Sequence, residues 1–119
     1  MPNPEGICKK NKLNTVHFLP FLSQARLKTI YRNATFFILP SKYGETWGLV
    51  VNEAMASRLP VLVSNQAGCA STLVKKGVNG FTFSPDNINE LSELLYRMDK
   101  LTDQIRNEMG QKSREIISE

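Results

Sequence analysis

Apolar residues recur along the chain in two alternating arrangements, one typical of strands and the other of helices. Short runs of strand length and largely apolar character occupy residues 35–40 (TFFILP), 60–65 (PVLVSN) and 81–85 (FTFSP), and the first of them is apolar from Phe36 to Pro40 without a break. Continuous apolarity of this kind is typical of parallel strands covered on both faces. A further β-rich run, residues 15–19 (TVHFL), is cut off by Pro20. These runs predict four short strands.

Between the runs, apolar positions three and four residues apart predict amphipathic helices. The first helix begins after Ser23, a good N-cap, and its apolar face consists of Leu27, Ile30, Tyr31 and Ala34. A second helix is expected at about residues 48–57, and a short third helix at residues 70–77 closes at Gly77. Each helix follows a predicted strand.

Two longer helices are predicted in the last third of the chain. Asn87 followed by Glu90 forms a capping-box-like start. The apolar face of the helix that follows consists of Ile88, Leu91, Leu94, Leu95, Met98 and Leu101. The last helix begins at about residue 102 and is expected to turn Ile105, Met109 and Ile116 inward.

This alternation of strands and helices predicts an α/β fold with right-handed crossovers. The expected architecture is a Rossmann-like open parallel sheet with flanking helices, which is half of a doubly wound nucleotide-binding fold. Residues 1–14 are interpreted as a polar lead-in, and residues 15–119 as one partial Rossmann-like domain.

Composition narrows the function classes. The net charge is +4, from 15 basic and 11 acidic residues, and no run of five like charges occurs; this disfavours nucleic acid as a partner. Cys8 and Cys69 form no CxxC motif, and with His17 as the only histidine no metal site is expected. Reduced thiols in the cytosol are the default interpretation.

The loop at residues 41–47 leaves the carboxyl end of a predicted strand and leads into a helix start. Ligands of open α/β sheets bind at that edge, where unpaired helix N–H groups and the helix dipole favour an anion. Gly48 leaves room for a phosphate to approach the backbone. We therefore expect a phosphate site at this helix start.

Two carboxylates flank that helix start, Glu45 before it and Glu53 eight positions later. A bare phosphate would be repelled by them, whereas the hydroxyl-rich ends of a nucleotide-sugar would donate hydrogen bonds to both. The alternative is that Glu45 complements the helix dipole and Glu53 is a solvated helix residue. The two carboxylates alone do not decide between these interpretations.

The stretch LPSKYGETWGLVVNEAMASRLPVLVSN resembles the donor-binding signature of retaining glycosyltransferases of the GT-B fold, family four. That signature has Pro-Ser after a strand, two glutamates eight positions apart, Ala-Met-Ala and Pro-Val. VHFLPFLSQARLKTIYRNATFFILPS upstream and GVNGFTFSPDNINELSELL downstream are similar to the neighbouring elements of the family. The chain is thus expected to be the C-terminal half of a GT-B fold, truncated at its N-terminus.

The resemblance implies a role for each matching residue. Glu45 would contact the transferred sugar and is the candidate catalytic residue, in a positioning role. Glu53 would bind the ribose hydroxyls. The backbone around Gly48, Leu49 and Val50 would meet the diphosphate. The base would lie near two residues of the preceding loop, Leu22 and Ser23.

The implied reaction transfers a sugar from a nucleoside diphosphate sugar to an acceptor hydroxyl with retention, with no cofactor and no metal. The implied partners are the nucleotide-sugar donor and a missing N-terminal acceptor domain, without which the fragment is expected to be inactive. The implied location is the cytoplasm, with peripheral contact at the inner face of a membrane. A non-catalytic nucleotide-sugar-binding module, or a subunit of a split transferase, is the alternative.

The sequence departs from the family pattern at four places, one of which is Thr72, where many members carry an acidic residue. No stretch matches the Arg and Lys that clamp the pyrophosphate in that family. Pro20 replaces a glycine near the base-binding loop. Arg58 stands where the family usually has a helix-ending glycine, and a left-handed conformation there would cost an arginine roughly 1 kcal/mol more than a glycine.

Overall fold

The computed structural model describes residues 16–20, 22–41 and 49–118. Its sheet contains three parallel strands in the order β1-β2-β3, with bounds Phe37–Leu39, Val61–Ser64 and Gly80–Phe83. The register pairs Phe37 with Val61 and Val61 with Gly80. The predicted α/β fold with an open parallel sheet is confirmed.

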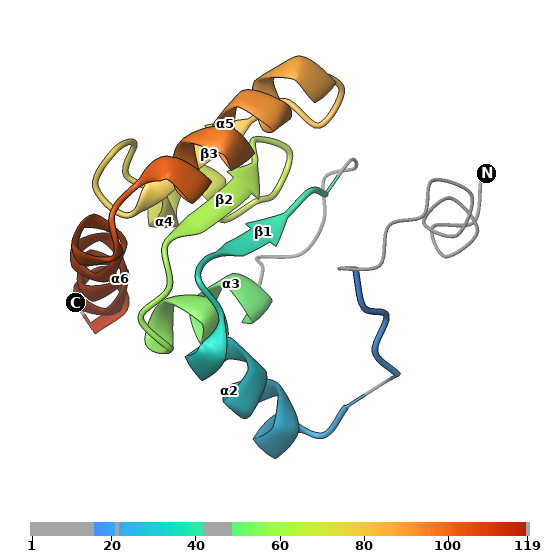
Figure 1. The fold of residues 1–119 in the computed structure, drawn as a ribbon, viewed down its shortest axis with the longest axis vertical. Coiled ribbons are helices and arrows are strands. Elements are labelled where there is room, and N and C mark those ends of the chain that lie inside the picture. The colour runs from blue at the N-terminus through green and yellow to red at the C-terminus, as the bar shows by residue number, and fades with distance from the viewer. Residues whose placement is uncertain (1–15, 21, 42–48, 119) are drawn as a thin grey trace.

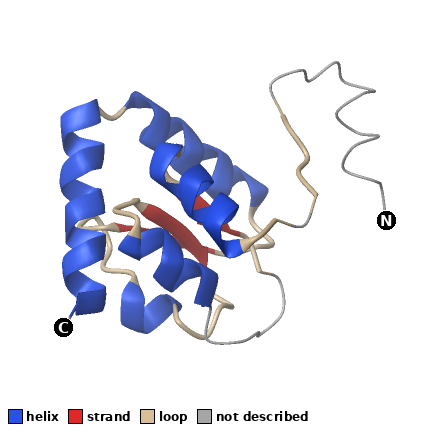
Figure 2. Ribbon diagram, turned by 90° about the horizontal axis from the view of Figure 1, so that it is seen from below, coloured by secondary structure: helices blue, strands red, loops and turns tan. Residues whose placement is uncertain are grey.

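Helices cover both faces of this sheet, as Figures 1 and 2 show. Two short crossover helices connect the strands, α3 between β1 and β2 and α4 between β2 and β3. A longer helix precedes the sheet and two follow it. The bounds of the five described helices are α2 Gln24–Asn33, α3 Leu49–Ala56, α4 Ala70–Leu73, α5 Ile88–Lys100 and α6 Asp103–Ser118.

The central strand β2 divides the core into two clusters because its four residues are all fully buried. Val61 and Val63 face a cluster formed mainly with α3 and α4. Leu62 faces the opposite cluster, which contains Met98 of α5 and Met109 of α6. Consecutive strand residues point to opposite faces, so this unbroken apolar strand supplies both cores.

The end of α3 is held by an unusual turn. The Arg58 N–H donates to the Met55 carbonyl (3.0 Å), and the Leu59 N–H donates to the Ala54 carbonyl (3.2 Å). This pair of bonds is the Schellman motif, which requires a left-handed residue at the position of Arg58. Arg58 has a φ of 62°. The left-handed arginine considered from the sequence is confirmed.

Helix α6 packs directly on that turn. A Cβ atom added to Gly110 would come within 2.0 Å of the Arg58 carbonyl oxygen. No real Cβ contact is that short, so the glycine is required for the close approach of the two segments. Helix α6 therefore fixes the place where α3 ends.

The loop before β3 is organised by a buried side chain. Asn79 is fully buried; its Oδ1 accepts from the Lys75 N–H (2.7 Å), and its Nδ2 donates to the Leu73 carbonyl (3.1 Å). Gly77 has a φ of 75° in the same loop. The predicted helix at residues 70–77 is shorter than expected, since it ends at Leu73 and Gly77 belongs to the loop.

The predicted strand at residues 15–19 is wrong for its described part, because residues 16–20 form no strand. The three strands of the described sheet offer these residues no pairing, and Leu19 is 61% exposed. Three isoleucines expected on the apolar faces of helices, Ile30, Ile88 and Ile105, are exposed instead. Ile88 and Ile105 lie in the first turns of α5 and α6.

The caps expected from the sequence form only in part as predicted. Ser23 caps α2, with its Oγ accepting from the Arg26 N–H at 3.4 Å. Asn87 Oδ1 accepts from the Glu90 N–H (3.0 Å), which is one half of a capping box. The Glu90 carboxylate accepts instead from the Ser84 N–H (2.6 Å) and so ties α5 to the end of β3.

Candidate functional site

The candidate site lies where β1 ends and α3 begins. Figure 1 shows the start of α3 on the side to which the carboxyl end of β1 leads. Glu45 and Gly48, the predicted sugar and phosphate contacts, lie outside the described residues. The described part of the prediction therefore consists of Leu49, Val50 and Glu53, together with Leu22 and Ser23.

The start of α3 is open to solvent. Leu49 is 71% exposed and Val50 is 41% exposed, whereas Val51 is fully buried against the sheet. The first N–H groups of a helix lack intrahelical acceptors and carry the positive end of the dipole. Two exposed apolar side chains at such a start leave its backbone accessible to an anionic ligand.

Glu53 lies one helical turn after Leu49 and is half-buried. It lines a groove of about 700 Å³ between α3, α4 and the end of α6, together with Asn52, Thr72, Lys75, Ile116 and Ile117 among others. Small-molecule sites commonly have volumes of about 300–1,000 Å³. The groove therefore has the size for a ligand of the nucleotide class.

The Glu53 carboxylate has unused hydrogen-bonding capacity. Within the described part of the chain it makes no hydrogen bond and no ion pair, and a carboxylate has two oxygens that can accept hydrogen bonds. Its charge nevertheless acts on α2. Burial first, and the Glu53 carboxylate second, raise the pKa of the Tyr31 hydroxyl. Glu53 is thus an available acceptor in a groove, and its field extends to the neighbouring helix.

Leu22 and Ser23 lie at the start of α2, where Ser23 is the exposed N-cap and Leu22 is half-buried. Neither residue is among the described residues that line the groove of Glu53. The Ser23 oxygen already accepts from the Arg26 N–H, but its hydroxyl hydrogen is free to donate. Leu49 and Val50 share α3 with Glu53 but are not among the described residues that line its groove, and the two base-binding candidates lie on a separate element.

The groove also contains Thr72, which the sequence marked as a departure from the family pattern, and two polar residues that sequence reasoning did not assign to the site, Asn52 and Lys75. Lys75 adds a cation beside Glu53, which suits a ligand with both hydroxyls and phosphates. The adjacent lysines at positions 75 and 76 were visible in the sequence. Only the folding of α4 against α3 shows that one of them lines the groove.

The described residues give no support for a metal site or for a membrane-spanning helix. No group of three or more potential metal-ligating side chains gathers in them. No helix in these ranges combines the length and the apolarity needed to cross a bilayer. Cys69 is a buried free thiol, and this burial raises its pKa.

Residues 5–116 match the family model described as "Glycosyl transferases group 1". A D-inositol 3-phosphate glycosyltransferase from Nocardia farcinica is 45% identical over 65 residues, which cover 55% of this chain and 14% of that protein. A sucrose-phosphate synthase from Thermosynechococcus elongatus superposes on 96% of this chain and 28% of its own, with a TM-score of 0.84 and 28% identity.

The same fold occurs in the C-terminal domain of a glycosyl transferase group 1 family protein from Francisella tularensis. Its TM-score is 0.83 at 22% identity, and the superposition covers 96% of this chain and 58% of that one. The chain spans about a fifth or less of the length of the first curated relatives that it matches.

Proposed function

The chain belongs to the glycosyl transferases group 1 family, and on that premise we propose that it is the donor-binding domain of a retaining glycosyltransferase. The whole enzyme transfers a sugar from a nucleoside diphosphate sugar to an acceptor hydroxyl. An additional acceptor domain is needed for transfer, so the 119-residue chain alone binds the donor without turnover. A cytoplasmic location, with peripheral membrane contact for a lipid acceptor, belongs to the same proposal.

The observation that carries this proposal is the position of Glu53. A half-buried carboxylate without a hydrogen-bond partner among the described residues lines a groove of about 700 Å³ on the helix that follows β1. Carboxylates accept strong hydrogen bonds from vicinal hydroxyls, and the partly exposed Glu53 carboxylate can accept them from a ligand in the groove. A ribose ring offers two such hydroxyls.

The remaining roles are those that the family resemblance implies for the matching residues. The backbone of Leu49 and Val50 precedes Glu53 by about one turn, so it would face the diphosphate when Glu53 holds the ribose. Gly48 and Glu45 come next toward the N-terminus and would face the phosphates and the transferred sugar. Leu22 and Ser23 would lie near the base. The helix start and Lys75 would offset charge on the departing diphosphate.

Titration of the chain with UDP-, GDP- and ADP-sugars in a calorimeter tests the proposal. We expect one of these donors to bind with 1:1 stoichiometry. Glu53→Gln should weaken that binding about tenfold, because hydrogen bonds to a charged group contribute about 1.5–3 kcal/mol. Amide resonances of residues 49–53 should shift during the titration.

Glu93→Gln is the matched control, since Glu93 lies exposed on α5, away from the groove. It removes the same charge and should leave donor affinity unchanged. Absence of binding for all three donors, or equal weakening by the two substitutions, would contradict the proposal.

A further inference from the structure

A second groove, of about 710 Å³, opens where β1 and β2 begin, at the opposite edge of the sheet from the proposed donor site. Its walls are the end of α2, the turn after α3, and one side of α6. Among the described residues, only Ala56 lines both grooves. The second groove is therefore a separate site on the far end of α3.

The lining of this groove is strongly cationic. Four arginines contribute to it, and Asp103 is its single acidic residue; the arginines are Arg32, Arg58, Arg106 and Arg114. Asp103 is neutralised by Arg106, whose Nη2 lies 2.6 Å from the carboxylate. The other guanidinium nitrogen of Arg106 donates to the Met98 and Leu101 carbonyls and so caps α5.

Three positive charges remain without compensation. Arg114 donates only to the neutral Ser118 hydroxyl. Arg32 and Arg58 make no hydrogen bond through their side chains and no ion pair within the described ranges. Like charges in one groove repel each other, so an anion that lies among the three would relieve this repulsion.

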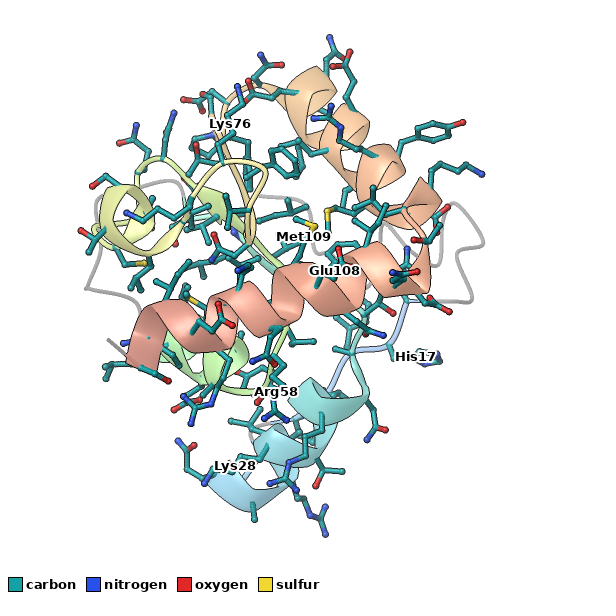
Figure 3. The ribbon with its side chains drawn as sticks, turned by 90° about the vertical axis from the view of Figure 1, so that its left-hand side faces the viewer. His17, Lys28, Arg58, Lys76, Glu108 and Met109 are labelled. Atoms are coloured by element: carbon teal, nitrogen blue, oxygen red, sulfur yellow. The ribbon has the colours of Figure 1, made fainter. Side chains whose placement is uncertain are left out.

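The packing of the turn after α3 does not explain why an arginine stands at position 58. Its backbone is left-handed, with a φ of 62°, at the position of the Schellman motif where glycine is the most stable residue. An exposed arginine kept in a strained conformation points to a use for its side chain. Figure 3 shows Arg58 in the space between α6 and α2, and it shows Lys28 on α2, farther from α6 than Arg58 is.

Arg32 has a second explanation, because a cation in the last turn of α2 is favoured by the helix dipole. The dipole of α3 favours a cation at Arg58 in the same way, because Arg58 closely follows the end of that helix. It does not explain why a residue with a Cβ atom occupies the left-handed position of a turn already closed by backbone hydrogen bonds. The presence of Arg32 and Arg58 in the same groove favours the binding of an anionic ligand there.

We propose that this groove binds a phosphate group, presented by a soluble phosphate ester or by an anionic lipid headgroup. Guanidinium groups match phosphate oxygens in pairs of parallel hydrogen bonds. The Asn107 amide on the groove wall adds a neutral donor for a hydroxyl or ester oxygen of the same ligand. The site is independent of the donor site and would hold its ligand while a nucleotide-sugar is bound.

Amide-resolved NMR titration of the ¹⁵N-labelled chain tests this proposal, first with inorganic phosphate and then with a sugar phosphate. We expect saturable shifts at Arg58, Leu59 and Asn107. Arg58→Gly should weaken binding about tenfold. Because glycine suits the left-handed turn better, this variant should fold at least as stably as the unmodified chain.

Lys28→Gln removes a charge from the same helix as Arg32 but outside the groove, and it should leave the affinity within about twofold of the original. Arg32→Gln should weaken binding in the same direction as Arg58→Gly. Glu53→Gln should leave it unchanged, so failure here is distinguishable from failure of the proposed donor function.

Vesicle sedimentation separates the two sources of phosphate. Binding to phosphatidylglycerol vesicles that is lost in Arg58→Gly assigns the site to a lipid headgroup, and binding of sugar phosphate without vesicle binding assigns it to a soluble ester. The proposal is overturned by the absence of saturable shifts at Arg58 and Leu59, by shifts confined to residues 49–53, or by equal weakening in Lys28→Gln and Arg58→Gly.

Discussion

The two ends of α3 are built in opposite ways. At its end, the Schellman turn is closed by two backbone hydrogen bonds, and α6 contacts the Arg58 carbonyl through Gly110. At its start, Leu49 and Val50 are exposed. One end of the same helix is thus fixed by close packing, while the other is available to a ligand.

This difference indicates how a short helix can position a binding residue. Helix α3 spans only Leu49–Ala56, and an isolated helix of this length would not be stable in water. Its buried residues Val51, Ala54 and Met55 fix it on the sheet. Glu53, on another face of the helix, inherits that fixed position without taking part in the packing itself.

The largest expected effect comes from removing the packing that holds α3. Met55→Ala should reduce the free energy of unfolding by about 2–5 kcal/mol, because Met55 is fully buried in the core cluster. Leu49→Ala, at the exposed start of the same helix, should change it by less than about 0.5 kcal/mol. Chemical denaturation of both variants measures the difference, and comparable losses would mean that the two ends are not distinct.

A smaller effect is expected from disturbing the contact between α6 and the turn. Gly110→Ala places a Cβ atom against the Arg58 carbonyl oxygen, and forcing such a contact usually destabilises a protein by about 1–3 kcal/mol. Gln111→Ala on the exposed side of α6 is the control. An unchanged midpoint in Gly110→Ala would show that α6 does not constrain the end of α3.

The sequence predicted the fold where burial determines the pattern. The run at residues 60–65 became the central strand because continuous apolarity matches a strand buried on both faces. The run at residues 15–19 is also rich in residues that favour strands, but its described part has no pairing partner in the described sheet, and local composition cannot reveal that. Ile88 and Ile105 also followed the helical period, yet both are exposed.

The two grooves could be predicted from the sequence less well than the donor-binding motif. The spacing of the two glutamates indicated a helix start with a carboxylate one turn in, and Glu53 lies in such a place. Thr72 and Lys75 join it only through the packing of α4 and α6. The arginines of the second groove come from three separate segments of the chain, so no run of basic residues in the sequence indicated them.

The smallest expected effect concerns the charge of Glu53 on α3 and its influence on Tyr31 of α2. Burial, and then the Glu53 carboxylate, raise the pKa of Tyr31. The folded protein therefore retains the phenol proton at pH values where the unfolded chain has released it, near the ordinary pKa of about 10. It follows that the stability contributed by the neutral phenol is present below that pH and is lost as the pH rises through the folded pKa.

Tyr31→Phe should consequently make the free energy of unfolding decline less steeply between about pH 9 and pH 11. Glu53→Gln should lower the pKa of Tyr31, as followed by the ring proton resonances, because it removes the second of the two causes. Tyr96→Phe, at an exposed position on α5, is the control and should leave the pH profile unchanged. If the pKa of Tyr31 stays the same in Glu53→Gln, the carboxylate lies farther from α2 than the structure places it, and its position as a ligand anchor at the open end of α3 would need revision.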